Sequence, residues 1–383
     1  MRRPRITSRS LPGFPLWDKA KVTRLPLSFD LELTARCNNN CRHCYINLPA
    51  GDSAAKAREM EFGFIMDIAD QAISMGALWC LLTGGEPLLR RDFAEIYLGL
   101  RKKGLLVSVF TNAALVGEEE AELFRAYPPR HMEVSVYGVT KESFERVTRT
   151  PGSFAAFRKG LDRLLKAGIK VRFKTMAVRS NLLELPAIAD YCRARTSQVF
   201  RFDPLIHLRV DGDRARNEDI KGERLTAQEI VALERSDPER FGALERNCDS
   251  LILPGRGASG CRHLLYCGAG QASFAVTWDG RFSLCLSLRH PDCLYDLRQG
   301  SLSLRQAWKD FSPHVLALQS GKADFLQKCG GCSIINLCLW CPAHAHLETG
   351  ELDMPVDYFC EVAQGRFRAL QEALRGWKKD QFS

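Results

Sequence analysis

The stretch Arg36-Cys37-Asn38-Asn39-Asn40-Cys41-Arg42-His43-Cys44-Tyr45 places three cysteines at Cys-x3-Cys-x2-Cys spacing, directly after the apolar, strand-like run 31–34. Three thiolates on one short loop make an incomplete metal site, because a structural zinc takes four ligands in a closed tetrahedron. A [4Fe-4S] cluster likewise has four irons to ligate, so three cysteines leave one iron free to bind a small molecule. The alternative is a zinc loop whose fourth ligand is His43 or a distant residue.

A second motif, Thr83-Gly84-Gly85-Glu86-Pro87, follows another apolar run, 78–82. Paired glycines let a backbone edge approach a ligand closely, and the Glu86 carboxylate beside them can receive an ammonium group. A zinc loop requires neither this motif nor an aromatic residue such as Tyr45 next to its third cysteine. Both features therefore favour an open iron–sulfur cluster over zinc.

Together the two motifs resemble those of the radical S-adenosylmethionine (SAM) superfamily. One departure is visible, since His43 precedes the third cysteine where many members carry an aromatic residue. The resemblance implies that a cluster is held by Cys37, Cys41 and Cys44. Its unique iron would chelate the amino and carboxylate groups of SAM. The residues that would hold the SAM amine from the other side are Gly84, Gly85 and Glu86.

The composition of the chain is that of a folded protein with an ordinary core. It has 383 residues, 45% of them hydrophobic, and a formal net charge of +9. Basic and acidic residues are interspersed, which favours a mixed solvated surface over a nucleic-acid footprint. The first 36 residues are locally basic, and this excess would help to attract an acidic peptide.

The lack of a targeting signal and the number of cysteines indicate a cytoplasmic protein. Pro4, Pro12 and Pro15 interrupt the region behind Arg2-Arg3, so no secretory signal is expected. No run approaches the roughly 18 apolar residues of a membrane span. Since the cytoplasm keeps thiols reduced, the 15 cysteines indicate metal ligation and not a disulfide framework.

Between residues 28 and 205, short apolar runs alternate with amphipathic stretches, a pattern typical of βα units around a parallel sheet. Strands are expected over 29–34, 78–83, 105–111, 132–137, 170–177 and 198–203. Helices are expected between them, among them 62–75 and 154–167, the latter capped by Ser153. Six such units predict a partial (β/α)6 TIM-type barrel, in which the chemistry gathers at the carboxyl ends of the strands. Both motifs fall there.

Other strand ends supply further candidates. Asn112 and Ser135 end the third and fourth predicted strands, where their side chains would hydrogen-bond the ribose or carboxylate of SAM. The alternative is that they are turn residues with satisfied side chains. Asp203 ends the sixth strand two residues after Arg201, hence on the same face. It is a candidate acid/base or substrate contact, and a structural ion pair is the alternative.

A second cysteine array follows after residue 260. It consists of Cys261-x5-Cys267, Cys285 shortly after Gly280, the run Cys329-x2-Cys332-x5-Cys338-x2-Cys341, and Cys360. Eight thiolates would ligate two four-iron clusters completely, and two structural zincs need the same number. The spacing resembles the SPASM domain, the auxiliary-cluster extension of radical SAM enzymes, except that the Cys338–Cys341 interval is one residue short.

This resemblance also implies a ligand set. The nearer auxiliary cluster would be held by Cys261, Cys267, Cys285 and Cys341. The outer cluster would be held by Cys329, Cys332, Cys338 and Cys360. A hairpin expected over 274–277 and 282–286, with its turn at Asp279-Gly280, would bring Cys267 near Cys285. The remaining cysteines are expected to be packing thiols, with Cys293 as a replacement ligand if the short interval disturbs the site. They are Cys80, Cys192, Cys248 and Cys293.

The sequence thus predicts five segments: a basic amino-terminal arm (1–27), a radical SAM partial barrel (28–205), a bridging region (206–260), a SPASM domain (261–362) and a carboxyl-terminal helix or tail (363–383). The resemblance implies SAM and three [4Fe-4S] clusters as cofactors. It also implies reductive cleavage of SAM to a 5′-deoxyadenosyl radical that abstracts a substrate hydrogen. Similar maturases oxidise or cross-link ribosomally made peptides through thioether or carbon–carbon bonds.

Two alternatives to peptide modification stay open. One is oxidation or decarboxylation of a small molecule, such as an alcohol, a sugar or a tetrapyrrole, by the same machinery. The other is a zinc-stapled binding protein without catalysis. The expected partners are a precursor peptide or small-molecule substrate and a reductant such as flavodoxin or ferredoxin. Since only 36 residues precede the cysteine loop, a separate leader-peptide recognition protein is expected, or a groove formed by the basic arm.

Overall fold

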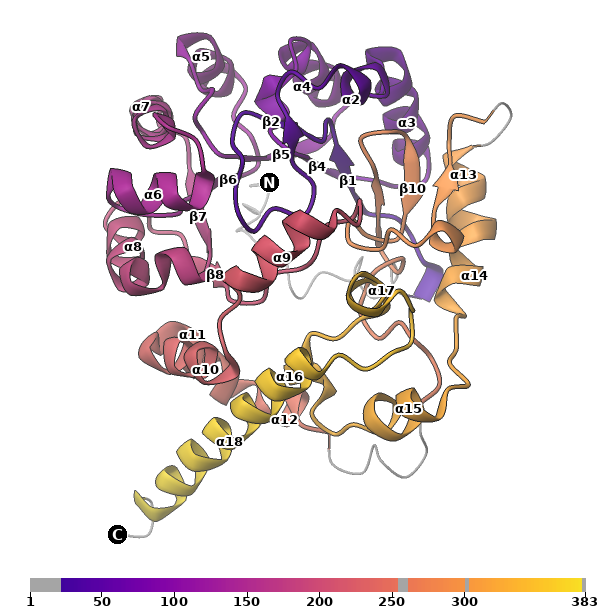
Figure 1. Ribbon diagram of the computed structural model, residues 1–383. Helices are drawn as coiled ribbons and strands as arrows, with labels where there is room; N and C mark the ends of the chain where they lie inside the picture. Colours follow the sequence, from indigo (N-terminus) through magenta and orange to yellow (C-terminus); the bar gives the residue numbers. More distant parts are fainter. Residues whose placement is uncertain (1–21, 254–260, 300–302, 381–383) are drawn as a thin grey trace, which may run out of the picture.

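The computed structural model describes residues 22–253, 261–299 and 303–380 (Figure 1). Six parallel strands lie side by side in the order β1-β4-β5-β6-β7-β8. They are β1 (Ser28–Glu32), β4 (Trp79–Thr83), β5 (Leu106–Thr111), β6 (Met132–Ser135), β7 (Val171–Met176) and β8 (Arg201–Asp203). The predicted partial (β/α)6 barrel is therefore confirmed. Most of the basic arm, residues 1–21, lies outside the described residues.

Side chains along each strand alternate between an apolar outer face and a polar inner face of the sheet. Phe29 of β1 pairs in register with Cys80 of β4, which pairs with Val107 of β5, and all three are buried in the core with the outer helices. Since side chains alternate along a strand, the residues next to these three in each strand face the inside of the half-barrel. This inward face carries polar groups, including Glu133 and Asp203, whereas the interior of a closed TIM barrel is a packed apolar core.

The helices between the strands surround the outer side of the sheet in Figure 1. They are α2 (Ser53–Ala57), α3 (Phe62–Ser74), η2 (Pro87–Leu89), α4 (Phe93–Lys102), α5 (Glu118–Ala126), α6 (Lys141–Thr148), α7 (Ser153–Lys166), η3 (Arg179–Glu184) and α8 (Leu185–Arg193). The prediction that Ser153 caps α7 is wrong. Gly152 is the N-cap, with φ of 80°, and the Ser153 hydroxyl instead lies 2.7 Å from that of Thr148.

The bridging region is helical and connects the barrel to the carboxyl-terminal helix. It contains α9 (Arg214–Glu223), α10 (Ala227–Ser236), α11 (Pro238–Arg246) and α12 (Cys248–Leu251). Thr226 caps α10, as a charged helix near 226–235 predicts. Glu234 of α10 forms a buried ion pair at 2.7 Å with Arg366 of α18 (Asp357–Asp380), and α18 continues across residue 362. Since both charges are buried and paired, this contact fixes α18 against the bridge.

The cysteine-rich region joins the same sheet as the barrel. Strand β9 (Ser273–Val276) pairs parallel with β1 and antiparallel with β10 (Arg281–Ser283), which pairs with β11 (Tyr295–Asp296). The predicted hairpin turn is present, with Gly280 at φ of 84°. The other elements are η5 (Pro291–Cys293), α13 (Leu304–Gln306), η6 (Ala307–Phe311), α14 (Ser312–Leu316), α15 (Ala323–Phe325), η7 (Leu326–Gly330), α16 (Ile335–Cys338) and α17 (Pro342–Thr349).

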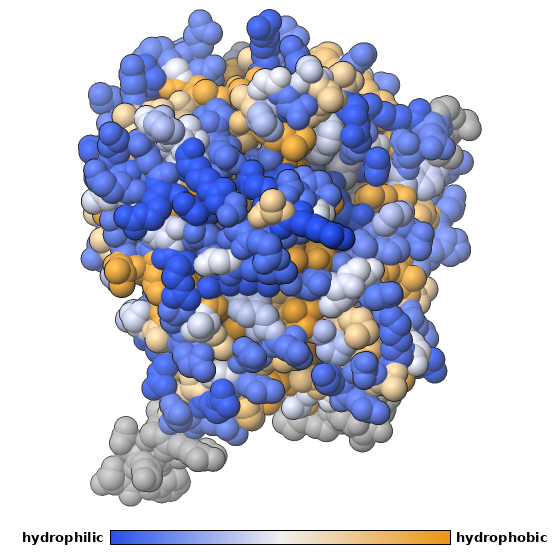
Figure 2. All heavy atoms as spheres, in the orientation of Figure 1, coloured by the Kyte–Doolittle hydropathy of each residue, from blue (hydrophilic) through white to orange (hydrophobic). Residues whose placement is uncertain are grey.

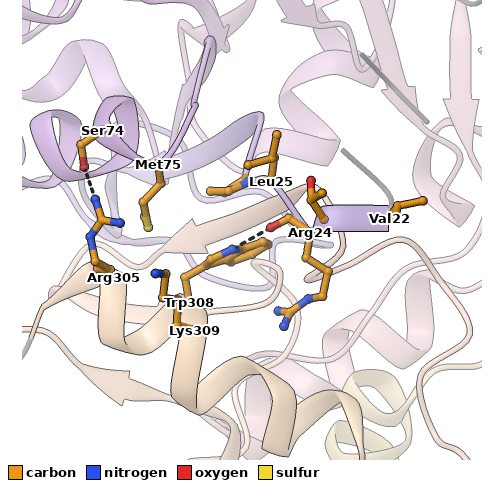
Figure 3. A pocket seen from close by; sticks show the side chains of 10 residues that line it. Val22, Arg24, Leu25, Ser74, Met75, Arg305, Trp308 and Lys309 are labelled. Atoms are coloured by element: carbon orange, nitrogen blue, oxygen red, sulfur yellow. Dashed lines mark hydrogen bonds between the residues drawn. The ribbon is translucent and has the colours of Figure 1, made fainter. Parts of the chain in front are cut away.

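A cavity of about 500 Å³ lies between the segment before β1 and the α13–η6 segment (Figure 3). The Trp308 indole N–H donates to the Arg24 carbonyl at 2.9 Å, and Arg305 donates to Ser74 Oγ at 3.0 Å. The first contact attaches the chain before β1 to the cysteine-rich region, and the second attaches the end of α3 to it. The cavity is therefore at the end of β1 opposite to the cysteine loop. None of the helices in the described ranges combines the length and apolarity of a membrane span.

Candidate active site

The cysteine loop is closed by its own backbone and held by α6. Its two ends pair as the short strands β2 (Arg36–Cys37) and β3 (Leu48–Pro49). In its middle, the Asn40 N–H donates to the Thr148 carbonyl at 2.9 Å, and the Arg42 N–H donates to the Val147 carbonyl at 3.0 Å. These bonds satisfy orphan carbonyls at the end of α6. The loop conformation is therefore fixed by protein contacts.

Two arginines of the bridging region hold the loop from outside. Arg209, only 2% exposed, donates to the Cys44 carbonyl at 3.3 Å and to Asn47 Oδ1 at 2.9 Å. Arg216 of α9 donates to the Cys41 carbonyl at 3.2 Å and to Asn40 Oδ1 at 2.8 Å. Helix α9 lies in front of the strands in Figure 1, and Figure 2 shows hydrophilic side chains gathered around it. No motif in the sequence indicates this clamp of Arg209 and Arg216.

The three loop cysteines lie within electrostatic reach of one another. Burial raises the pKa of Cys41, and the neighbouring charges of Cys37 and Cys44 raise it further. Burial, then Glu86, also raises the pKa of Cys37. Neighbouring buried thiolates are unfavourable without a cation, and the irons of a cluster supply that charge. Among the described residues, no three His, Cys, Asp or Glu side chains converge on a single ion. The donor set fits a cubane, in which each cysteine binds a different iron.

The two glycines of the second motif bring the end of β4 against the backbone that enters the cysteine loop. A Cβ on Gly84 would lie 2.3 Å from the Thr34 carbonyl oxygen, and one on Gly85 would lie 2.2 Å from that of Arg36. The Gly85 N–H also donates to the Thr34 carbonyl at 2.7 Å. Any larger residue would push the two segments apart. Contact with SAM through Gly84, Gly85 and Glu86 stays a prediction.

Glu86 joins the ends of β4 and β5. Its carboxylate has no exposed surface and accepts from Thr111 Oγ1 at 2.8 Å, the Asn112 N–H at 2.7 Å and the Leu88 N–H at 3.2 Å. Burial raises the pKa of Glu86 to about 7, against the lowering effect of these hydrogen bonds. The Asn112 amide then donates to Asn38 Oδ1 at 2.8 Å, beside Cys37. Glu86, Asn112 and the cysteine loop therefore form one connected group.

Ser135, at the end of β6, lies beside Tyr137. The Tyr137 ring packs on the His43 ring, with 5.0 Å between centroids, so Ser135 is close to the cysteine loop. Burial, then the charge of Lys174, lowers the pKa of His43 to about 4. His43 is therefore a neutral, packed imidazole, and within the described part of the chain its buried Nδ1 has no hydrogen-bond partner.

Asp203 lies at the end of β8 and is ion-paired. Its Oδ2 is 2.7 Å from Lys174 Nζ, with side chains 46% and 30% exposed respectively. Arg201, on the same face, pairs with Glu133 of β6 at 2.6 Å. Asp203 thus takes part in an ion pair whose partner comes from β7. A catalytic role for Asp203 stays a prediction.

The second cysteine array forms two groups. In the first, Cys285 and Cys341 lie within electrostatic reach of Cys267 and of each other. In the second, Cys329 lies within such reach of Cys332 and Cys360, and Cys338 is hydrogen-bonded to Cys360. Cys261, expected in the first group, has its backbone N–H bonded to the Gly330 carbonyl at 3.0 Å, next to Cys329. Of the four remaining cysteines, three are buried (Cys80, Cys192 and Cys293) and Cys248 is partly exposed.

A buried polar chain links the loop to the cysteine-rich region. The Tyr45 hydroxyl donates to Glu32 Oε1 at 3.4 Å, and the same oxygen lies 2.6 Å from Arg289 Nη2. Glu32 has no exposed surface, and Arg289 follows four residues after Cys285. Burial raises the pKa of Glu32, and the Arg289 charge opposes this rise. Sequence reasoning missed this link because the partners are more than 240 residues apart.

Comparisons with known proteins agree with this geometry. The model of the Radical SAM superfamily matches residues 31–189. Fe-coproporphyrin III synthase from Methanosarcina barkeri (strain Fusaro / DSM 804) is 25% identical over 80% of this chain and 80% of that protein. The antilisterial bacteriocin subtilosin biosynthesis protein AlbA from Bacillus subtilis (strain 168) is 26% identical over 82% of this chain and 71% of that protein.

Among solved structures, Streptococcus suis SuiB bound to precursor peptide SuiA shares the fold. It superposes with a TM-score of 0.65 and 14% identity over 94% of this chain and 84% of that chain. The segment matched by the family model runs from β1 into α8 and contains the cysteine loop and the glycine motif. Residues 31–189 therefore match a radical SAM domain, and the rest of the chain lies outside that match.

Proposed function

We propose that this chain is a maturase that uses SAM, one SAM-binding [4Fe-4S] cluster and two auxiliary clusters to oxidise or cross-link a ribosomally made peptide. The observation that carries the proposal is the presence of two further cysteine groups in the region that extends the sheet of a radical SAM half-barrel, one of them tied to β1 through Arg289 and Glu32. Such extra thiolate sites are the feature of SPASM-type maturases.

The residues of the chain divide between holding cofactors and orienting them. Cys37, Cys41 and Cys44 would hold the first cluster, on a loop fixed by Arg209 and Arg216. The SAM contacts would come from Gly84, Gly85, Glu86, Asn112 and Ser135. SAM on its cluster supplies a hydrogen-abstracting radical, and the protein supplies position and shielding. Asp203 and Lys174, both partly exposed at the site, would contact the substrate.

A peptide fits the open, charged inward face of the half-barrel. Two side chains of β7 and β8 on this face, Lys174 and Asp203, are partly exposed and ion-paired with each other. An extended peptide presents polar groups along its length and would meet this face with compensating contacts. AlbA is named as a bacteriocin biosynthesis protein, and the SuiB structure holds a precursor peptide; both support a peptide as the substrate class.

A second candidate is modification of a tetrapyrrole. It is favoured by one observation, the similarity to Fe-coproporphyrin III synthase over four fifths of both chains. The two candidates share the radical chemistry and differ only in the substrate. Incubation with Fe-coproporphyrin III, in parallel with precursor peptides encoded beside the gene, separates them by which compound changes mass.

The test of the shared chemistry is anaerobic purification followed by incubation with dithionite and SAM. We expect about twelve irons per chain, from three four-iron clusters, and release of 5′-deoxyadenosine. The matched control is the triple variant Cys37→Ala/Cys41→Ala/Cys44→Ala, which should keep about eight irons and release none. A colourless wild-type protein loaded with zinc would contradict the proposal.

A further inference from the structure

A group of basic side chains lies at the end of the half-barrel opposite to the cysteine loop. It consists of Arg130 and His131, which directly precede β6, Arg172 near the start of β7, and Arg201 at the start of β8. We call these four residues the basic cluster. Nothing in the proposed chemistry uses them, because the cysteine loop and the glycine motif lie at the carboxyl ends of the strands.

The three arginines lie within electrostatic reach of His131, and Arg172 lies within reach of Arg130 as well. Burial, followed by the charges of Arg172, Arg130 and Arg201, lowers the pKa of His131 to about 4. The Arg130 guanidinium lies 5.0 Å from the centroid of the Trp79 ring, and a ring nitrogen of His131 lies 3.3 Å from Ser108 Oγ. The basic cluster therefore comes from the starts of β6, β7 and β8 and contacts Trp79 of β4 and Ser108 of β5.

The basic cluster has fewer acidic partners than charges. In the contacts of the described residues, Glu133 pairs with Arg201 at 2.6 Å. Arg172 has a neutral partner, the Gln198 side-chain oxygen at 3.4 Å, and Arg130 has the Trp79 ring. All three arginines are exposed, Arg201 with 58% of its side chain. Like charges gathered at one surface raise the local concentration of anions, so an anionic ligand is favoured here.

The distance over which the cations of the basic cluster extend favours a chain of carboxylates over a single phosphate. Neighbouring strands are about 4.8 Å apart, so cations on β6, β7 and β8 extend over about 10 Å. A single phosphate would contact one or two of them, whereas carboxylates along an extended chain recur every two residues, about 6.7 Å apart. We propose that the basic cluster binds an acidic segment of the peptide that the chain modifies. The identity of that peptide rests on the proposed function.

The experiment measures binding of a fluorescein-labelled Glu-rich decapeptide to the anaerobic holoenzyme by fluorescence anisotropy. We expect the double variant Arg130→Gln/Arg172→Gln to bind about three- to tenfold more weakly than the wild type, since each exposed ion pair contributes modestly. The dependence of binding on salt should also become less steep. The control Arg235→Gln/Lys322→Gln removes the same charge elsewhere on the surface and should bind like the wild type.

Three results would overturn the inference: equal binding by the wild type and the Arg130/Arg172 variant, equal binding of the Glu-rich peptide and its Gln counterpart, or displacement of the Glu-rich peptide by an equal concentration of inorganic phosphate. Failure of the proposed function is distinguishable. A holoenzyme that binds the peptide through the basic cluster and releases no 5′-deoxyadenosine contradicts only the function. Release of 5′-deoxyadenosine with unaltered peptide binding in the variant contradicts only this inference.

Discussion

The half-barrel and the cysteine-rich region are stabilised by different means. In the half-barrel, α3, α4 and α7 run for 13, 10 and 14 residues and cover strands whose outer side chains, such as Leu31 and Val107, have no exposed surface. In the cysteine-rich region, α13, η6 and α14 form one unbroken helical stretch over 304–316 that packs into the core, whereas the segments that carry cysteines are shorter: α15 runs into η7 over 323–330, and α16 has 4 residues. Helical segments as short as these last two are not stable by themselves. The first region is held by apolar burial, and the short segments of the second depend more on what their cysteines bind.

The same contrast applies to the two kinds of cysteine site. The loop of Cys37, Cys41 and Cys44 is held by contacts from α6 and from two arginines. The groups around Cys285 and Cys360 lie on short segments, with the β9–β1 pairing and the Arg289–Glu32 contact as attachments to the barrel. Loss of iron should therefore affect the two regions unequally.

Removal of iron should give the largest effect. Chelation after oxidation should raise amide hydrogen exchange in residues 303–349 by roughly 100-fold, while β1, β4 and β5 keep their protection, because local opening follows local stability. Hydrogen-exchange mass spectrometry of holo and iron-free protein gives the comparison. An equal rise of hydrogen exchange in both regions would contradict the proposed difference in how they are stabilised. Unchanged exchange in the cysteine-rich region would contradict it as well.

Substitution of Glu86 should give the next largest effect, a loss of stability that is confined to the half-barrel. Glu86→Ala leaves Thr111, Asn112 and Leu88 with unpaired buried donors, each costing about 1–3 kcal/mol of unfolding free energy. Glu86→Gln keeps the shape and one acceptor oxygen and should cost less. Urea unfolding of both variants measures the difference. Equal stability of the two variants would show that these hydrogen bonds do not fix the strand ends.

Substitution of Arg216 should weaken the first cluster without unfolding the chain. Arg216→Gln removes the donors to the Cys41 carbonyl and to Asn40, at a cost of about 1–2 kcal/mol. We expect faster loss of iron from the cysteine loop on exposure to a chelator. Arg214→Gln, an exposed change on the same helix, is the control and should lose iron at the wild-type rate. Identical rates for both variants would remove Arg216 from the clamp.

Substitution of Asp203 should give the smallest change in stability. Its ion pair with Lys174 is partly exposed and contributes at most about 1 kcal/mol. Asp203→Asn should leave substrate-free release of 5′-deoxyadenosine unchanged and lower the yield of modified substrate. Chromatography of both products checks this split. Equal loss of both would mean that Asp203 supports the SAM site and not the substrate.

The parallel strands and the site motifs were predictable because their signals are local. Apolar runs such as 78–82 and the glycines behind them are readable in a few residues. The predicted strands 132–137 and 198–203 extend beyond β6 and β8. At β6 the difference is small, because the Val136 N–H still donates to the Lys174 carbonyl at 2.9 Å.

The contacts between distant segments were not predictable. No local pattern indicates that β9 pairs with β1, or that Arg209 and Arg216 hold the cysteine loop. The glycine motif also makes a contact that the sequence did not predict. Its residues were expected at the site, but the backbone contact with Thr34 and Arg36 that excludes a Cβ depends on the folded chain.

The central claim is that three cysteines leave one iron of the first cluster open to SAM. Electron paramagnetic resonance of the reduced holoenzyme, recorded with and without SAM, tests it most directly. We predict a cluster signal that shifts when SAM is added and that is absent from the Cys37→Ala/Cys41→Ala/Cys44→Ala variant. A signal from this cluster that is identical with and without SAM would contradict the account.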